Sequence, residues 1–176
     1  MLKGERIYLR NVEITDLDFI ERLENNPENW LISGTLKPFS KKNLEEYILS
    51  IGDLTSDEQF RWIICLSDSD KRIGAIDLFE YDQKLRRTGM GIIIEEEFRK
   101  SGLATEAISI LNEYAFSSLN LSQLWANILD DNHASQRLFE KSGFQRTATK
   151  KKWFVVDGEW HDEHLYQLEN IKLNQS

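Results

Sequence analysis

The stretch EEEFRKSGLATEA, residues 95–107, joins an apolar strand-like segment to a helical pattern through a short turn. Gly102 allows backbone conformations that a Cβ atom would forbid, and its small neighbours let a ligand approach the main chain. The first N–H groups of the following helix are unpaired and carry a partial positive charge. The turn is therefore a candidate site for a phosphate or pyrophosphate, although one glycine before a helix is more often only a turn.

Strand and helix patterns extend from this turn in both directions. We expect strands at residues 6–13, 60–68, 73–81, 86–94, 123–129, 145–156 and 163–169, and helices at residues 16–26, 40–51, 104–119 and 133–144. Thr15 and Ser40 are the expected helix caps, Gly143 is an expected C-cap, and Asp157-Gly158 indicates a hairpin. The helix at 104–119 crosses between two strands, which makes that pair parallel. The order predicts one mixed α/β domain over residues 1–176, with a mostly antiparallel sheet.

Composition limits the classes of function. The chain has 176 residues and a net charge of −8, which argues against non-specific nucleic-acid binding and favours a cationic partner or simple solubility. No apolar run reaches the length of a membrane span, and the first ten residues lack the apolar core of a signal peptide. The single cysteine, Cys65, cannot form an internal disulfide, so we expect a cytoplasmic protein with no membrane or nucleic-acid partner.

Two motifs together carry a family resemblance. The turn has the pattern R-x-x-G-x-A after an apolar strand, and NHASQRLFEKSGF follows about thirty residues later. This combination resembles the acetyl-coenzyme A motifs of the GCN5-related N-acetyltransferase (GNAT) superfamily. Similarity to the branch of ribosomal-protein alanine and spermidine acetyltransferases extends nearly end to end, through LRNVEITDLDFI, IGAIDLFEYDQKLRRTGMGIII and DGEWHDEHLYQL. The resemblance implies a GNAT-like acyl-CoA N-acyltransferase fold, with a splayed parallel strand pair and about four helices.

The resemblance also implies how acetyl-coenzyme A, the co-substrate, is bound. The strands at 86–94 and 123–129 splay apart, and the pantetheine arm pairs in the gap with the main chain of Ile92, Ile93 and Ile94, like an added strand. A backbone N–H near Ile93 or Ile94 polarises the thioester carbonyl, and Asn132 reaches the pantetheine arm. The pyrophosphate binds the N–H groups of the turn, which are those of Arg99, Lys100, Ser101, Gly102, Leu103, Ala104 and Thr105.

The implied reaction is direct attack of a primary amine on the thioester, after a carboxylate or water has removed the proton of the amine. Many relatives protonate the leaving thiolate with a tyrosine, where this chain has Phe139. Ser135, one helical turn earlier, matches a serine that some ribosomal-protein-type relatives use, although it can equally be a helix-start hydroxyl. Asp77 and Glu80 are the candidate carboxylates; they lie on opposite strand faces, so at most one faces the site, and either can be a solvated residue.

The acceptor is less well defined than the cofactor. Spermidine-type relatives carry a glutamate at position 89 that touches the polyamine, whereas Gly89 and Gly91 here share a strand face and are expected to open space beside the acetyl group. Trp30 and Tyr166 are candidate substrate contacts, with loop pinning and core packing as their alternatives. We expect a small cationic amine such as a polyamine, or a protein N-terminus, as the acceptor, and a homodimer by resemblance. A non-catalytic coenzyme A- or partner-binding protein and an antibiotic or amino-sugar acetyltransferase are the alternatives.

Two further residue types suggest other chemistry and are expected to have structural roles. His161 and His164 lie three apart on opposite strand faces with no third ligand in sequence, so we expect surface histidines and no metal. Cys65 lies between apolar neighbours and is expected to be buried, which argues against an acyl-cysteine route.

Overall fold

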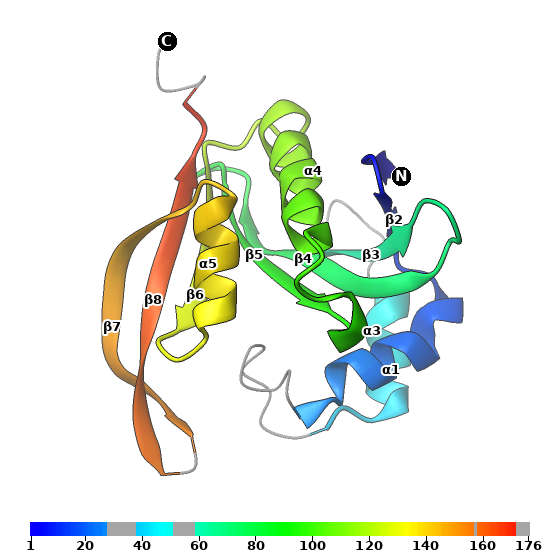
Figure 1. The fold of residues 1–176 in the computed structure, drawn as a ribbon, viewed down its shortest axis with the longest axis horizontal. Coiled ribbons are helices and arrows are strands. Elements are labelled where there is room, and N and C mark those ends of the chain that lie inside the picture. The colour runs from blue at the N-terminus through cyan, green and yellow to red at the C-terminus, as the bar shows by residue number, and fades with distance from the viewer. Residues whose placement is uncertain (28–37, 51–58, 157, 172–176) are drawn as a thin grey trace.

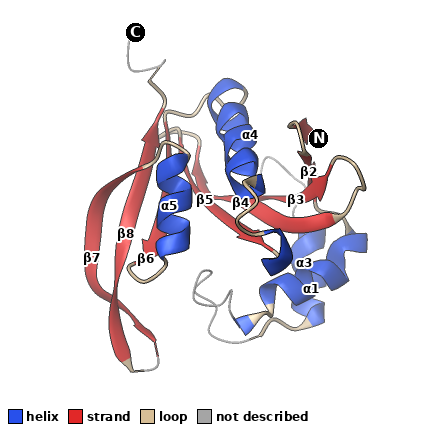
Figure 2. Ribbon diagram, in the orientation of Figure 1, coloured by secondary structure: helices blue, strands red, loops and turns tan. Residues whose placement is uncertain are grey.

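The computed structural model describes residues 1–27, 38–50, 59–156 and 158–171, in which an eight-stranded sheet is flanked by four α-helices (Figures 1 and 2). The strands are β1 (Leu2–Lys3), β2 (Ile7–Asn11), β3 (Phe60–Leu66), β4 (Arg72–Asp82), β5 (Arg87–Ile94), β6 (Gln123–Leu129), β7 (Gln145–Val156) and β8 (Glu159–Glu169). The helices are α1 (Leu17–Glu24), α3 (Lys41–Ser50), α4 (Leu103–Ser117) and α5 (His133–Lys141), with short 3-10 turns at Ile14–Asp16 and Glu96–Phe98.

The strand order is β1-β2-β3-β4-β5-β6-β8-β7. All neighbours pair antiparallel except β5 and β6, which α4 connects by a crossover. The predicted mixed α/β fold, mostly antiparallel sheet and parallel pair are therefore confirmed. β1 was not predicted, because two residues are too few to show a strand alternation, and β8 begins at Glu159 rather than at residue 163.

The parallel pair separates after three residue pairs. Arg87, Thr88 and Gly89 are opposite Gln123, Leu124 and Trp125, and no later pair joins the two strands, although both are described to their ends. β5 continues along β4 as far as Ile94, and β6 continues along β8 as far as Leu129. The predicted splay is thus present, and it leaves one edge of each strand open at the centre of the sheet.

The sheet is covered on both faces. α4 and α5 pack on one face, where Ile108 and Leu111 join the cluster that includes Ile76 and Met90 (Figure 1). α1 and α3 pack together on the other face, in a cluster that includes Ile93 of β5. Side chains alternate across a strand, so β4 and β5 are apolar on both faces, and each fully buried aliphatic side chain stabilises the fold by roughly 1.5–3 kcal/mol. Burial on both sides holds the splayed strands in place.

The cap of α1 differs from the expectation at Thr15. A 3-10 turn precedes the helix, and Glu13 and Asp16 form a capping box, with Glu13 N donating to Asp16 Oδ2 at 2.8 Å. Burial raises the pKa of Asp16, but hydrogen bonds from Arg10, Glu13 and Arg72 outweigh this effect and hold the pKa below its usual value. Asp16 therefore replaces Thr15 as the anchor, because it also links β2 to the helix. α1 ends at Glu24, two residues before the expected end.

Other local predictions are confirmed. Ser40 Oγ accepts a hydrogen bond from Asn43 N at 3.1 Å and caps α3, and Gly143 follows α5 with a φ of 93°. Cys65 is buried, and burial raises the pKa of its thiol, which disfavours a thiolate nucleophile. Trp30 and Ile51 lie outside the described residues. No helix within the described ranges combines the length and the apolar character that crossing a membrane requires.

Candidate active site

The turn before α4 has the backbone that its sequence predicts. Gly102 is the N-cap of α4, with a φ of 85°, in the left-handed region that favours glycine. A Cβ atom there would meet only Arg6 Nη2, at 3.4 Å, so the space above the turn is open. Lys100 also has a positive φ, 60°, a strained conformation for a residue with a side chain, of a kind found at ligand clamps. An open, strained turn at the N-terminus of a fifteen-residue helix fits a phosphate-bearing ligand.

Neighbouring side chains fix this turn in place. Arg99 Nε donates to Ile94 O at 3.0 Å, which ties the turn to the end of β5. Arg6 Nη1 donates to Ser101 O at 3.1 Å, and Arg6 Nε binds Glu106 Oε2 at 2.9 Å. Burial raises the pKa of Glu106, but hydrogen bonds from Arg6 and Ile7 outweigh it and lower the pKa. The turn is therefore clamped between β5, α4 and the N-terminal segment.

A groove of ≈ 490 Å³ runs from the turn to α5. Its lining contains ten of the twelve predicted cofactor residues, namely Ile92, Ile93, Ile94, Arg99, Lys100, Gly102, Ala104, Thr105, Asn132 and Ser135. The other two are absent from that lining: Leu103 packs into the core, and the Ser101 carbonyl is held by Arg6. Arg137 and Lys141 line the groove at α5 and add positive charge. The open edge of β5, the helix N-terminus and these cations together fit an extended anionic ligand such as coenzyme A.

A second cleft of ≈ 410 Å³ opens on the other side of the splay. It shares Ile92, Ile93, Asn132 and Ser135 with the groove, so the two cavities meet between β5 and β6. We call this second cavity the acceptor cleft. An acetyl group carried along the groove would reach the meeting point of the two cavities, where a molecule in the acceptor cleft could approach it.

α5 brings a hydroxyl to this meeting point. Asn132 Oδ1 accepts a hydrogen bond from Ser135 N at 3.1 Å and caps the helix. Within the described residues, the Ser135 hydroxyl and the Asn132 amide nitrogen have no hydrogen-bond partner. Phe139 lies one turn further on, lines the acceptor cleft and packs edge-on against Phe144 at 5.0 Å between ring centroids. Residues 135 and 139 therefore lie on one helix face, as their spacing of one turn implies, and both line the acceptor cleft.

The two predicted carboxylates lie in different places. Asp77 lines the acceptor cleft, where both of its oxygens bind Arg61, with Oδ1 2.5 Å from Nε and Oδ2 2.9 Å from Nη2. Arg61 also binds Glu24 Oε1 of α1 at 2.7 Å. Burial lowers the pKa of Arg61, but Asp77 and Glu24 raise it further than burial lowers it. Glu80 is exposed, has a φ of 49° and lines a separate cleft beside β4.

The expected space beside the glycines of β5 is filled at Gly89, whereas Gly91 lines the acceptor cleft. A Cβ atom at Gly89 would lie 2.4 Å from Phe79 Cε2, and one at Gly91 would lie 3.6 Å from Phe79 Cε1. The Phe79 ring packs edge-on against Trp125 at 5.1 Å. The expectation of open space at Gly89 is therefore wrong: the glycine admits an aromatic ring from the neighbouring strand, and Phe79 becomes part of the cleft wall.

Tyr166 is a core residue. It is 1% exposed and lines neither the groove nor the acceptor cleft, and its hydroxyl donates to Glu140 Oε1 of α5 at 3.2 Å. Burial raises the pKa of the phenol, and the nearby Glu140 raises it further. Of the two alternatives for Tyr166, core packing describes its position, and the other candidate substrate contact, Trp30, lies outside the described residues.

Sequence reasoning missed three charged residues of the acceptor cleft: Glu24, Arg61 and Glu163. Arg61 lies on β3 and Glu24 on α1, and local sequence patterns do not predict an ion pair between such distant segments. Glu163 had a weak signal, because strand alternation puts it on the face of Leu165 and Gln167, opposite Tyr166. Its pairing with Lys150 across the β7–β8 hairpin fixes the carboxylate on the acceptor side.

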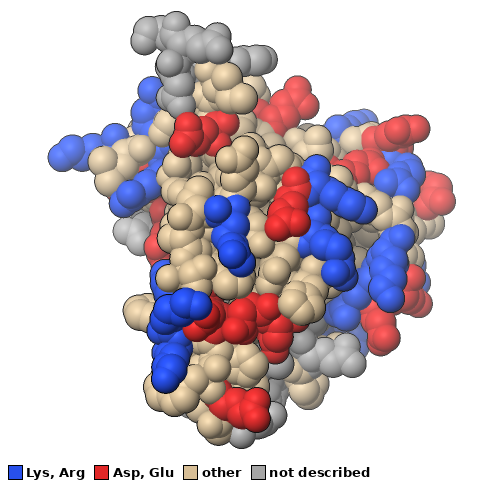
Figure 3. Space-filling model, turned by 60° about the vertical axis from the view of Figure 1, so that its left-hand side comes forward, with Lys and Arg blue, Asp and Glu red and all other residues tan. Residues whose placement is uncertain are grey.

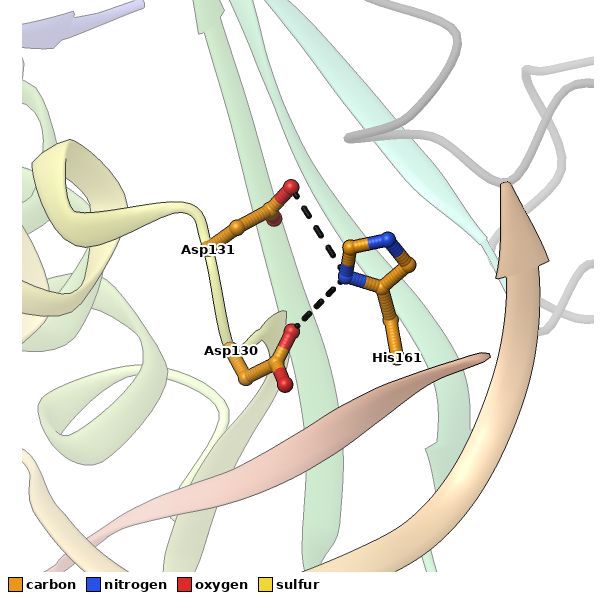
Figure 4. Close-up of side chains that lie close together, drawn as sticks. All are labelled: Asp130, Asp131 and His161. Carbon is orange, nitrogen blue, oxygen red and sulfur yellow. Dashed lines mark hydrogen bonds and ion pairs between the residues drawn. The ribbon is translucent and has the colours of Figure 1, made fainter. Parts of the chain in front are cut away.

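The histidines differ from the expectation. His164 is 8% exposed and contacts Thr149 and Arg146, and burial, followed by Arg146, lowers its pKa. His161 Nδ1 lies 3.1 Å from Asp130 Oδ1 and 3.8 Å from Asp131 Oδ2, which both point toward it from the turn before α5 (Figure 4). The ligand atoms of these three side chains lie within 4.8 Å of one another, but His164 is not among them, so in the described residues this group adds no third ligand to the His161–His164 pair.

The His161 group also has a structural function. Asp130 Oδ2 accepts a hydrogen bond from Asp162 N at 3.1 Å, and Asp130 N donates to Asp162 O at 3.0 Å. Burial raises the pKa of Asp130, but the hydrogen bonds from Asp162 and His161 outweigh it and lower the pKa. These contacts join the β6–α5 turn to β8, and they hold the start of α5 beside the acceptor cleft.

Comparison with known proteins agrees with this geometry. Residues 6–145 match the family described as the acetyltransferase (GNAT) domain. The chain is 28% identical to a probable N-acetyltransferase YjcK of Bacillus subtilis, over 97% of each chain, and 30% identical to a spermidine N(1)-acetyltransferase of Vibrio cholerae, over 98% of this chain and 99% of the relative.

Comparison with solved structures also indicates an N-acetyltransferase. A crystal structure of spermidine N-acetyltransferase from Vibrio cholerae in complex with CoA and spermine has a TM-score of 0.85 and 25% identity, over 93% of this chain and 95% of the other. Acetyl-coenzyme A is the acetyl donor of the family, and the groove described above fits it. The fold, the two motifs and the match over most of the chain lead to one conclusion: the chain belongs to the acetyltransferase (GNAT) domain family and is an N-acetyltransferase.

Proposed function

We propose that the chain transfers the acetyl group of acetyl-coenzyme A to a primary amine of a small cationic molecule. The lining of the acceptor cleft carries this proposal, because it contains three carboxylates, those of Glu24, Asp77 and Glu163, and one guanidinium, that of Arg61. A cleft with an excess of negative charge and low-dielectric walls concentrates cations. The amine nitrogen is itself such a cation before it loses its proton.

The distribution of charge elsewhere supports a role for the cleft in selecting the acceptor. The chain has a net charge of −8, yet Figure 3 shows acidic and basic side chains interspersed over one face of the molecule. Interspersed surface charges keep a protein soluble but select no particular ligand. Selectivity for a cation is therefore better explained by the acidic lining of the cleft than by that face.

Named relatives support an amine acceptor without fixing its identity. Spermidine N(1)-acetyltransferases of Vibrio cholerae and Escherichia coli are 30% and 25% identical to this chain. This chain differs from the spermidine-type pattern at Gly89, where the Phe79 ring occupies the space that a side chain would need. We infer that the acceptor contacts the ring of Phe79 and the carboxylates of the cleft instead of a glutamate at position 89.

Each part of the proposed site has a defined task. Bound acetyl-coenzyme A supplies a thioester whose carbonyl carbon the amine attacks. The N–H groups of Arg99 to Thr105 hold the pyrophosphate, and the open edge of β5 around Ile93 holds the pantetheine arm and polarises the carbonyl. Asn132 offers its amide nitrogen to the arm. Asp77, with both oxygens bound to Arg61, contributes fixed negative charge near the ammonium, whereas the exposed Glu80 lies away from the cleft.

An amine panel tests the proposed function. Coenzyme A release is measured with diamines and polyamines, amino sugars, and a peptide with a free N-terminus. We expect the highest kcat/KM for the small cationic amines, because the acidic lining attracts them. A preference for the peptide or for the amino sugars would replace the proposed substrate class, and no release with any amine would indicate a binding protein.

We also predict that Ser135 protonates the departing thiolate. Its hydroxyl lies where the two cavities meet, and Phe139, one turn away, cannot donate a proton. A coenzyme A thiolate is a fairly good leaving group, so Ser135→Ala should lower kcat by only roughly ten- to a hundredfold, within or below the usual range for a general acid. The thermal shift with acetyl-coenzyme A should not change. In that background Phe139→Tyr should restore part of the activity, and full activity of Ser135→Ala would leave solvent as the proton source.

A further inference from the structure

Glu163 is a carboxylate on the acceptor side of the splay that no motif assigns. It is 6% exposed, yet it lines the acceptor cleft. Lys150 Nζ binds its Oε2 at 2.5 Å, and within the described residues this is the only polar partner of the carboxylate. Lys150 lines the neighbouring cleft beside β4 and β6 but not the acceptor cleft, so it approaches Glu163 from outside. Oε1 is therefore the oxygen left for a ligand.

The other two carboxylates of the cleft share one guanidinium, and Asp77 is bound to it more fully than Glu163 is bound to Lys150. Both oxygens of Asp77 bind Arg61, at 2.5 and 2.9 Å, in a bidentate pair. Glu24 binds the same guanidinium at 2.7 Å. A carboxylate that holds a fixed guanidinium with both oxygens must break strong, charge-assisted hydrogen bonds before it can accept another proton. Glu163 can accept one without losing its contact to Lys150.

The sheet places Glu163 close to the reacting end of the cleft. In the β6–β8 register it lies opposite Leu129, the last residue of β6, while Asp77 lies opposite Gly91 on β5. The two carboxylates thus flank the splay from its two sides, on the sheet face opposite α5. Ser135 and Asn132 line the same cleft from the start of α5. Both carboxylates line the acceptor cleft, which meets the groove at Ile92, Ile93, Asn132 and Ser135.

We propose that Glu163 binds the acceptor ammonium through Oε1 and takes its proton, and this role rests on the proposed function. One N–H bond of the ammonium breaks and an O–H bond forms at Oε1, which leaves a neutral amine with a free electron pair. The amine nitrogen bonds to the carbonyl carbon as the C–S bond breaks. The nitrogen loses a second proton as the amide forms, and the thiolate takes up one proton to give coenzyme A. Glu163 passes the proton that it took from the ammonium to water, so each turnover releases one proton.

The charges around Glu163 suit this task. Lys150 on β7 holds Oε2, while Asp77, Glu24 and Arg61 face the same cleft from β4, α1 and β3. Together the cleft carboxylates stabilise an ammonium on arrival, and Glu163, unlike Asp77, has an oxygen outside an arginine pair that can take its proton. The Asp162 side chain, on the adjacent residue, binds Lys151 and the N–H of Lys152 instead of the cleft.

The test is the pH dependence of amine-dependent coenzyme A release by Glu163→Gln. At pH 7 kcat/KM should fall roughly ten- to a hundredfold for an alkylamine, at or just below the low end of the range for a general base. The defect should shrink as the pH rises toward the pKa of the alkylamine, about 10, because more of the amine is then already neutral. It should also be smaller for an amino-acid amide, whose amino group has a pKa of about 8. A structural defect would follow neither the pH nor the amine.

Three further measurements make the result decisive. Asp162→Asn removes the same charge one residue away, and its kcat/KM should stay within about twofold of that of the parent protein. Glu163→Asp keeps the charge but shortens the side chain by one methylene, so its kcat/KM should lie between those of the parent protein and Glu163→Gln. This variant tests the role even if Glu163→Gln folds poorly. The thermal shift with acetyl-coenzyme A reports that each variant is folded. An active parent with a Glu163→Gln variant of unchanged rate and pH profile overturns this role alone; a parent inactive with every amine overturns the proposed function and this role with it.

Discussion

Gly102→Glu abolishes the thermal stabilisation that acetyl-coenzyme A gives the parent protein; this is the result we expect. Gly102 has a φ of 85°, where a side chain costs roughly 1–3 kcal/mol of strain. The new carboxylate would also stand at the N-terminus of α4, in the space proposed for the pyrophosphate. Ligand that binds only the folded state adds about 2.7 kcal/mol at a hundredfold excess over Kd, so a thermal shift titration detects its loss.

Gly158→Glu is the matched control for that variant. Gly158 has the same φ of 85°, and nothing lies within 4 Å of a Cβ atom placed there, but it belongs to the β7–β8 hairpin. The substitution introduces the same strain and the same charge outside the groove, so the shift with acetyl-coenzyme A should remain. If Gly102→Glu binds the cofactor as tightly as the parent, the turn does not hold the pyrophosphate.

Local patterns in the sequence predicted the elements and the turn at Gly102, whereas the other cofactor residues were proposed from the family resemblance. The strand expected at residues 6–13 puts Ile7 and Leu9 on one face by alternation, and both are fully buried. Ser40 and Gly143 act as expected because helix ends are determined by a few neighbouring residues. The turn at Gly102 is local too, so its backbone could be predicted from its own residues.

The acceptor side could not be predicted in the same way, because it depends on contacts between distant segments. The register of β4 shifts between Phe79 and Asp82, where Glu80 has a positive φ. The Phe79 ring fills the space at Gly89, a contact between side chains of two strands that neither segment predicts alone. Glu163 enters the cleft only because β8 lies between β6 and β7 in the sheet.

The acceptor cleft therefore relies on a buried ion cluster, and Arg61 is its centre. The Arg61 side chain is 9% exposed and is shared by Glu24 and Asp77, which are themselves buried. It also lies over the Tyr47 ring, at 5.2 Å from the centroid. The cluster joins α1 and α3 to the central strands, so it connects the helical cover of the acceptor side to the sheet.

Arg61→Met should lower the free energy of unfolding by about 3–5 kcal/mol, measured by urea denaturation, because it leaves two buried carboxylates without their cation. The free energy of unfolding of Arg61→Lys should lie between those of the parent protein and Arg61→Met. A lysine ammonium lacks the planar guanidinium that binds both carboxylates at once. Adding Asp77→Asn to Arg61→Met should recover part of the loss by removing one of the two like charges, a coupling expected of residues in direct contact. Lys151→Met, which breaks the exposed pair with Asp162, should barely change the unfolding curve. A loss below about 1 kcal/mol in Arg61→Met would mean that water reaches the cluster and solvates the two carboxylates, and their charge would then attract an acceptor cation less strongly than proposed.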